Sequence, residues 1–242
     1  MICCAKKKYK TTDILFVLFF SLQGLFWYNS KDIQPDMTIV PPVPGHDAVH
    51  AIALGDEEFY FRVLALDIQN AGDSFGRFTA LKNYDYKKLF DWFQLLDYLN
   101  SKSNFVPSIA GYYYSQTQNV PDTRYIIRYL DQHASRDLEK KWWWMSQAVY
   151  IANHRLGDKK WALELAYKLS KTPGDIPMWA RQMPAFIHEQ LGEKQEAFKI
   201  IDDLMKNKDK LSKEELNFMN YFINERLNKM IEDSKPSKLL LK

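Results

Sequence analysis

One helical pattern occurs twice between residues 142 and 204, and this repeat constrains the fold more than any other feature of the chain. Leu156-Gly157-Asp158 in the first copy corresponds to Leu191-Gly192-Glu193 in the second, at a spacing of 35 residues. Four other pairs keep that spacing: Trp144 and Trp179, Gln147 and Gln182, Ala162 and Ala197, Leu169 and Leu204. A fixed period of this length is typical of proteins in which helix pairs stack on one another. The sequence therefore predicts an all-α fold, an irregular α-solenoid of antiparallel helix pairs.

Gly157 and Gly192 stand where an apolar helical pattern ends in each copy. Glycine at this position adopts the left-handed conformation that closes a helix C-terminus and allows a tight turn. Only 9 of the 242 residues are glycine, which disfavours a β-rich fold with many turns. Hydrophobic residues make up 46 % of the chain, enough for one continuous core.

Apolar residues at helical spacing predict further helices outside this repeat. These helices cover residues 57–70, 86–99, 106–118, 122–135 and 211–231. Those over 106–118 and 122–135 are interpreted as an earlier and more divergent copy of the repeat. Ser212 and Glu215 form a capping box that marks the start of the last helix. Pro184 lies within the first helix of the second copy and is expected to kink it, because proline removes a backbone hydrogen bond.

The N-terminal segment combines lysines with an apolar stretch. Residues 14–28 are almost wholly apolar, and they follow Lys6, Lys7, Lys8 and Lys10. With its polar flanks this stretch approaches the about 20 residues that a transmembrane helix needs. We expect an uncleaved transmembrane signal anchor over residues 13–30, because Phe26-Trp27-Tyr28 stands where signal peptidase requires small residues. A cleaved signal peptide and a buried N-terminal helix are the alternatives.

Charges and cysteines indicate where the chain resides. The lysines precede the apolar stretch without a matching cluster behind it, which places the N-terminus in the cytoplasm. Cys3 and Cys4 lie on that side, as reduced or acylated thiols, and the rest of the chain has no cysteine to form a disulfide. No Asn-x-Ser/Thr acceptor follows the anchor. We expect a single-pass protein of the bacterial inner membrane with its main domain in the periplasm.

Outside the N-terminal segment the charges of the chain balance. Without the first 30 residues, Lys+Arg and Asp+Glu number 29 each. Such a domain lacks the positive surface with which proteins bind nucleic acid, so nucleic acid is not an expected partner. The expected organisation is a basic cytoplasmic N-terminus over 1–12, the anchor over 13–30, a Pro-rich linker over 31–55, a helical-repeat domain over 56–232 and a disordered tail over 233–242.

Two patterns are compatible with ligand chemistry but favour a structural role. His46-Asp47-x-x-His50 would place two imidazoles on one helical face, as a metal site requires, yet it follows a proline-rich segment. We expect a linker or cap there, and neither a metal nor a cofactor. Trp142-Trp143-Trp144 cannot share one face of a helix, because consecutive residues lie about 100° apart. We expect core and inter-repeat packing for these tryptophans, with an aromatic ligand platform as the alternative.

The repeat resembles a known family. Leu156-Gly157-Asp158-x-x-x-Ala162-x-x-x-Ala166-x-x-Leu169 and Leu191-Gly192-Glu193-x-x-x-Ala197-x-x-x-Ile201-x-x-Leu204 are similar to the turn and second helix of tetratricopeptide (TPR) repeats. The resemblance covers residues 142–204 well and 105–135 weakly. The chain departs from the family at four positions: Tyr150 replaces a small residue, Asn153 and His188 replace a tyrosine, and Gly174 replaces the terminal proline. A bent, irregular TPR-like solenoid is therefore expected over 56–232.

The TPR resemblance implies a protein-interaction scaffold whose first helices line a concave surface. By correspondence that surface presents Gln147, Ile151, His154, Arg155, Gln182, Phe186, Glu189 and Gln190. The paired glutamines are suited to hydrogen bonds with the backbone of an extended peptide, or are simply solvated. We expect a membrane-anchored scaffold that binds a protein or peptide, or a structural subunit of a cell-envelope complex.

The alternative function is a periplasmic envelope enzyme or accessory domain that acts on cell-wall material. Such an enzyme needs an acid or base carboxylate in a buried, partnered position. The carboxylates considered are Asp91, Asp97, Glu139, Glu164 and Glu189, and none has a sequence context that suggests burial beside a partner. No Ser-His-Asp or Cys-His arrangement is apparent either. The sequence therefore predicts no catalytic residue and no enzyme.

Overall fold

The computed structural model describes residues 11–32, 38–74, 77–206 and 212–227. The chain separates into two units, Met1–Thr38 and Ile39–Lys242. Most of the expected basic N-terminus, and all of the tail expected over 233–242, lie outside the described residues.

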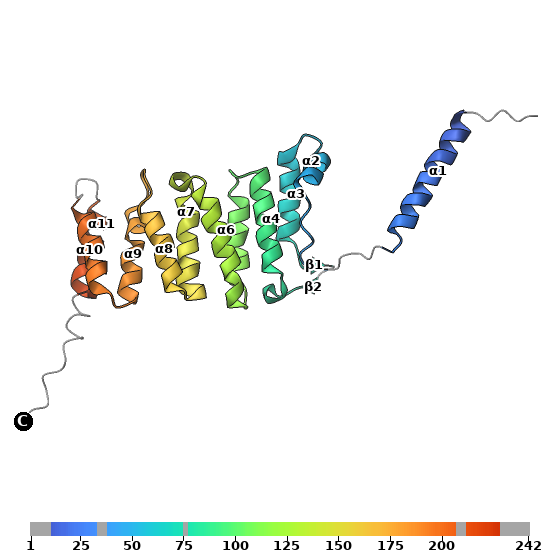
Figure 1. Cartoon of the computed structure of the whole chain (residues 1–242). Helices are drawn as coiled ribbons and strands as arrows, with labels where there is room; N and C mark the ends of the chain where they lie inside the picture. The colour runs from blue at the N-terminus through green and yellow to red at the C-terminus, as the bar shows by residue number, and fades with distance from the viewer. Residues whose placement is uncertain (1–10, 33–37, 75–76, 207–211, 228–242) are drawn as a thin grey trace, which may run out of the picture. The chain divides into compact units, whose positions relative to one another are not determined.

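The first unit contains helix α1, Thr11–Ser30 (Figure 1). None of its residues is buried. The helix is long and apolar enough to cross a membrane, by length and composition, with a mean hydropathy of 1.3. Its serines bond back into the helix: Ser21 Oγ donates to the carbonyl oxygen of Val17 at 2.8 Å and Ser30 Oγ to that of Phe26 at 2.7 Å. These bonds keep the serine hydroxyls satisfied without water.

The second unit is all-α apart from one very short ladder. Its α-helices are α2 His46–Ala53, α3 Glu57–Gln69, α4 Tyr86–Leu99, α5 Phe105–Ser108, α6 Thr123–Ser135, α7 Leu138–Tyr150, α8 Lys159–Ser170, α9 Met178–Gln190, α10 Lys194–Met205 and α11 Lys213–Tyr221. Short 3₁₀ helices cover Leu81–Asn83, Tyr114–Gln116 and Val120–Asp122, and π-helical turns cover Ile109–Tyr113, Ile151–Leu156 and Phe222–Leu227. Strands β1 Asp73–Ser74 and β2 Arg77–Phe78 pair antiparallel, Asp73 opposite Phe78. The predicted all-α class is confirmed for the described residues.

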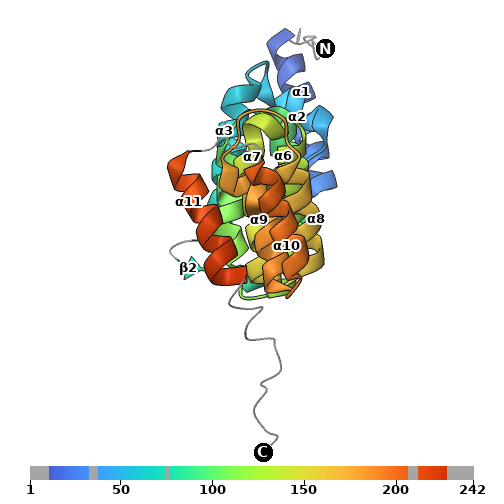
Figure 2. The same cartoon turned by 90° about the vertical axis from the view of Figure 1, so that its left-hand side faces the viewer.

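Helices that are consecutive in the chain are also neighbours in space. Figure 1 shows α3, α4, α6, α7, α8, α9 and α10 following one another across the unit in chain order. Contacts join α6 to α7, α7 to α8, α8 to α9 and α9 to α10. The links between them are short, so each of these helices runs antiparallel to the next. Figure 2, turned by 90°, shows α8 and α10 on one side of α9 and α11 on the other.

The helix ends are closed by residues that the sequence marks for this role. Asp56, Asp85, Asp137 and Asp158 each accept a backbone N–H in the first turn of the following helix. Ser212 and Glu215 form the predicted capping box of α11. Gly157 and Gly192 adopt the predicted left-handed conformation, with φ of 76° and 79°. These caps satisfy backbone groups that a helix terminus leaves without partners.

The prediction of an extended linker over residues 31–55 is wrong for residues 46–53, which form a helix. Residues 46–53 form α2, whose Val49 is fully buried, and the second unit already begins at Ile39. Trp92 Nε1 donates to the carbonyl oxygen of Pro41 at 2.8 Å, which ties the chain before α2 to α4. The prolines end at Pro44, and His46–Ala53 has apolar residues on one side only, so this stretch gains by packing as a helix.

The second unit has two hydrophobic clusters. The larger runs from Val40 in the chain before α2 to Ile187 on α9 and contains fully buried Phe93, Tyr114 and Leu130. The smaller consists of Ala185, Ala197, Ile201, Met219, Phe222 and Leu227. Both clusters include residues of α9, so α9 is where the two cores meet. A meeting of two separately packed cores is a natural place for a cavity.

Candidate functional site: a cavity between the repeated helices

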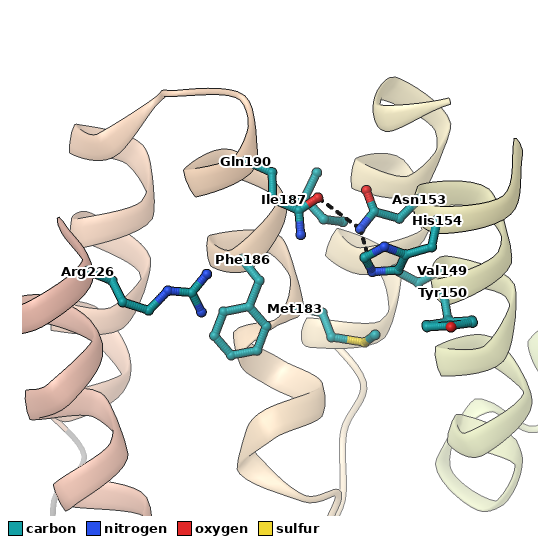
Figure 3. Close-up of a pocket in the computed structure, with 9 residues that line it drawn as sticks. All are labelled: Val149, Tyr150, Asn153, His154, Met183, Phe186, Ile187, Gln190 and Arg226. Carbon is teal, nitrogen blue, oxygen red and sulfur yellow. Dashed lines mark hydrogen bonds between the residues drawn. The ribbon is translucent and has the colours of Figure 1, made fainter. Parts of the chain in front are cut away.

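A cavity of about 220 Å³ opens where the two hydrophobic clusters meet (Figure 3). It is bounded by α7 with the π-helical turn 151–156, by α9, and by the π-helical turn 222–227. Its walls are Val149, Tyr150, Asn153, His154, Met183, Phe186, Ile187, Gln190 and Arg226. The cavity is smaller than the roughly 300–1,000 Å³ of small-molecule and cofactor sites. Its size therefore favours a single bulky group over a whole cofactor.

Amide groups and an ammonium form the polar end of the cavity. Asn153 Nδ2 donates to Gln190 Oε1 at 3.1 Å and to His154 Nε2 at 3.0 Å (Figure 3). Lys159 Nζ donates to Asn153 Oδ1 at 2.9 Å and also to Gln190 Oε1. Because an amide nitrogen only donates, His154 Nε2 is the acceptor and its proton lies on Nδ1. The network therefore holds His154 in one neutral tautomer.

The electrostatics at this end agree with a neutral histidine. Burial lowers the pKa of His154 below its usual 6.5, and the positive charge of Lys159 lowers it further. Both effects disfavour the imidazolium form. Lys159 forms no ion pair among the described residues, and its ammonium donates to two neutral amide oxygens.

Arg226 forms the opposite wall of the cavity. Its Nη2 is 2.7 Å from Glu189 Oε2, and Glu189 is 97 % buried. The guanidinium carbon lies 5.3 Å from the ring centre of Phe222, in cation–π contact. An uncompensated buried carboxylate is costly, so this ion pair holds Arg226 in position beside the cavity.

The floor of the cavity is aromatic and aliphatic. Phe186 packs edge to face on Phe218 and Phe222, with ring centres 5.9 and 5.3 Å apart. Met183 lies near Phe186, and Tyr150 on the opposite wall contacts the ring of His154 at 4.9 Å (Figure 3). These side chains offer a polarizable surface that suits an aromatic or branched aliphatic group.

Exposed aromatic side chains extend this surface along α7 and α9. Trp143 and Trp179 are 40 % and 41 % exposed, and their rings meet edge to face at 6.2 Å. Trp143 Nε1 donates to the hydroxyl of Tyr112 at 2.7 Å. Trp144, by contrast, is buried and donates to Asn104 Oδ1 at 2.9 Å. As predicted, the three consecutive tryptophans do not share a face, and Trp143 is the exposed one.

No protein-family model matches the chain, and neither a curated protein nor a solved structure matches it significantly.

Of the eight expected binding residues, His154, Phe186 and Gln190 line the cavity. Gln147 is half-buried on α7. Ile151, Gln182 and Glu189 are buried, with 2 %, 1 % and 3 % exposure, so the structure does not place them on the surface where they were expected. Arg155 is also committed elsewhere, because its Nη2 donates to the carbonyl oxygens of Ser115 and Thr117, each at 3.2 Å.

A one-residue shift explains these errors. Positions on the outer side of the two first helices correspond at a spacing of 36 residues: exposed Trp143 with exposed Trp179, exposed Tyr150 with half-buried Phe186, and exposed His154 with exposed Gln190. The buried positions Ser146 and Gln182, Ile151 and Ile187, and Asn153 and Glu189 keep the same spacing. From the glycine turns onward the spacing is 35 residues, as the buried pair Ala162 and Ala197 shows. A shift of one residue rotates a side chain by about 100° around a helix, which is enough to exchange surface for core.

The π-helical turn 151–156 accommodates the additional residue. There the N–H of Gly157 and the N–H of Asp158 both bond to the carbonyl oxygen of Ala152. A π-helical turn inserts one residue into an α-helix, and such insertions often occur at functional sites. Tyr150, Asn153 and Met183 were missed for this reason. The aromatic pairs at a spacing of 36 are the sequence signal that could have found them.

The expectation that no carboxylate is buried beside a partner is also wrong. Asp97 is 98 % buried, and it accepts hydrogen bonds from Tyr129 and Arg136 at 2.8 and 2.7 Å. His133 Nδ1 lies 2.7 Å from the same carboxylate. Burial is the main cause that raises the pKa of Tyr129 well above its usual value. This network joins α4 to α6 and does not line the cavity, so its geometry indicates that it holds the two helices together.

The His46 and His50 pair is engaged with protein groups. His50 Nε2 lies 2.9 Å from the Tyr98 hydroxyl, and its Nδ1 lies 2.7 Å from Glu57 Oε1. The ring of His46 packs against Tyr98 in a tilted arrangement, with ring centres 4.3 Å apart. Within the described ranges, no three His, Cys, Asp or Glu side chains are grouped so that they could hold a metal ion.

Proposed function

We propose that this protein is a membrane-anchored interaction scaffold that binds a protein or peptide partner through the surface formed by α7, the turn 151–156 and α9. The observation that supports it best is the cavity beside His154, Phe186 and Gln190 on the two repeated first helices. The family resemblance implies partner binding by the first helices of the repeats, and α7 and α9 are these helices.

The character of the surface supports binding more than catalysis. Its exposed side chains are mostly aromatic, and aromatic residues are enriched where proteins bind partners. The cavity has an apolar floor with amide groups at one end, as a site for one anchoring side chain requires. The carboxylates buried beside partners, Asp97 and Glu189, do not line it.

Helix α1 supports the anchored form of this proposal. It exposes an apolar surface along its whole length, which water does not favour and a bilayer does. We infer that α1 is an uncleaved signal anchor, that the chain crosses the bacterial inner membrane once, and that the second unit is a TPR-like solenoid in the periplasm.

Site-specific photo-crosslinking in living cells tests the proposal. We expect a benzophenone amino acid at Tyr150 to capture a partner, because this side chain lines the cavity and is 52 % exposed. Phe198 on α10 is 45 % exposed outside the cavity and is the matched control. One stoichiometric product indicates a complex subunit, and heterogeneous products indicate a peptide binder. Products from Phe198 but none from Tyr150 would reject this surface.

A further inference from the structure

The charges around the cavity indicate what kind of partner segment it accepts. Among the described residues that line the cavity there is no acidic side chain, and Arg226 is the one that carries a full charge. Glu189, which pairs with Arg226, is buried behind it. Lys159 lies beside the cavity, because its Nζ donates to Asn153 and Gln190, which line it. The cations at the cavity are therefore Arg226 and Lys159.

Lys159 is the less compensated of the two cations. It is the first residue of α8, where the helix dipole already favours negative charge and opposes an ammonium. The nearby carboxylate of Asp158 accepts the N–H of Trp161 at 2.9 Å and is committed to capping α8. A cation at the positive end of a helix, without an ion pair, is the arrangement of an anion-binding group.

The amide groups beside Lys159 point to a peptide as the source of that anion. His154 Nδ1 and Gln190 Nε2 make no hydrogen bond within the described part of the chain, and both residues are exposed beside the cavity. Two neutral donors next to an apolar cavity can bind backbone carbonyl groups while a side chain fills the cavity. A fatty acid has the same carboxylate and apolar group but no amide carbonyls for these donors.

We propose that the cavity binds a peptide segment in which a large apolar side chain, seated between Phe186 and Tyr150, is followed closely by an acidic residue that pairs with Lys159. This inference rests on the proposed function and specifies its ligand. Arg226 forms the wall on the other side of the apolar group.

Selection from a random peptide display library tests the inference with the full chain in lipid nanodiscs. The Phe186→Ala variant serves for counter-selection. We expect the enriched sequences to combine a bulky apolar residue with a nearby Asp or Glu. Enrichment without acidic residues would overturn this inference and leave the proposed function standing. No enrichment over Phe186→Ala would also overturn this inference, and the crosslinking at Tyr150 would then decide the proposed function separately.

Calorimetric titration then tests the role of Lys159. A selected peptide and its Glu→Gln counterpart are titrated into the wild-type chain, Lys159→Met and the neighbouring control Lys160→Met. Loss of one charge-assisted hydrogen bond corresponds to about tenfold weaker binding. We expect that loss for the Gln peptide on the wild-type chain, and no difference between the peptides on Lys159→Met. An unchanged preference for Glu on Lys159→Met contradicts the inference.

Self-association of the wild-type chain that is lost in Phe186→Ala would also contradict the inference, because a second copy of the chain would then fill the cavity.

Discussion

At the scale of single residues, Asp97 shows how a buried charge is maintained. Its carboxylate is surrounded by Tyr129, His133 and Arg136, so three groups on α6 and just after it depend on one side chain of α4. Removing one partner of a buried ionic network leaves the others uncompensated, which is more costly than never having formed it. This residue is therefore a sensitive point of the fold although it is remote from the cavity.

We expect Asp97→Asn to lower the free energy of unfolding by about 3 kcal/mol, the lower end of the usual range for breaking a buried ion pair. The lower end applies because the Arg136 side chain is 42 % exposed and keeps contact with water. Urea unfolding followed by circular dichroism measures the effect. Asp91→Asn, on the same helix but without an ion pair in the described structure, is the control. Equal losses of unfolding free energy for the two variants would show that the network does not stabilise the fold.

His154 provides a pH-dependent reporter at the cavity. Its pKa is lowered by burial and by Lys159, so the unfolded chain binds a proton more readily than the folded chain. The contribution of His154 to stability is therefore complete above about pH 6.5 and is lost as the pH falls below that value. We expect NMR titration to give a pKa below 6.5 in the wild type and a higher one in Lys159→Met. An unaltered pKa would mean that the two side chains do not interact.

At the scale of elements, the glycine turns and the π-helical turn together set the register of the repeat. Gly157 and Gly192 end equivalent helices with the same left-handed geometry, although the first helix contains one more residue between Trp143 and its glycine. The turns are thus the same in both copies while the helix before them varies. The consequence is that the exposed faces correspond at 36 residues and the turns at 35.

We expect Gly157→Ala and Gly192→Ala each to destabilise the chain by about 1 kcal/mol, because a Cβ is strained at positive φ. No heavy atom lies within 4 Å of the added Cβ at either site, so the cost is conformational and not steric. Gly45, with φ of −68°, is the control, since alanine there fits the backbone and meets no neighbour. Thermal unfolding measures the three variants. A loss at Gly45 equal to the other two would contradict the conformational explanation.

The elements were more predictable from the sequence than the site. Helix periodicity, the glycine turns and the capping box of Ser212 and Glu215 are local patterns, and the structure confirms most of them. The helix expected over 106–118 is the exception, because it is α-helical only over Phe105–Ser108 and continues as a π-helical turn and a 3₁₀ helix to Gln116. The π-helical turn has no comparable local signature, because the same residues fit an α-helix. Arg226 lies 36 residues beyond Gln190, the spacing that also relates His154 to Gln190, but the repeat was identified at 35 residues and only up to residue 204. Only the structure therefore shows which side of α9 faces the cavity.

At the scale of the whole molecule, the two units differ in what their surfaces require. The first exposes a continuous apolar helix, while the described part of the second buries two hydrophobic clusters. The proposed topology places the first in a bilayer and the second beyond it. The cysteines allow a direct test, because the chain has only Cys3 and Cys4.

We expect a cysteine at position 54, in a background with Cys3→Ser and Cys4→Ser, to react with a membrane-impermeant maleimide in intact spheroplasts. Leu54 is 91 % exposed at the end of α2, so Leu54→Cys should leave the fold intact. The parent chain with Cys3 and Cys4 alone should react only after lysis, since these residues precede the proposed anchor. If position 54 were labelled only after lysis, the second unit would lie in the cytoplasm and the proposed topology would be wrong.

The indole cluster of Trp142, Trp143 and Trp179 gives the molecule an intrinsic optical probe. Their rings meet edge to face at 5.6 to 6.2 Å, on the same helices that bound the cavity. A segment bound along α7 and α9 would alter the water around the two exposed indoles and thus their emission spectrum. Occupancy can therefore be followed by fluorescence on the unlabelled chain, whatever the chemical identity of the ligand.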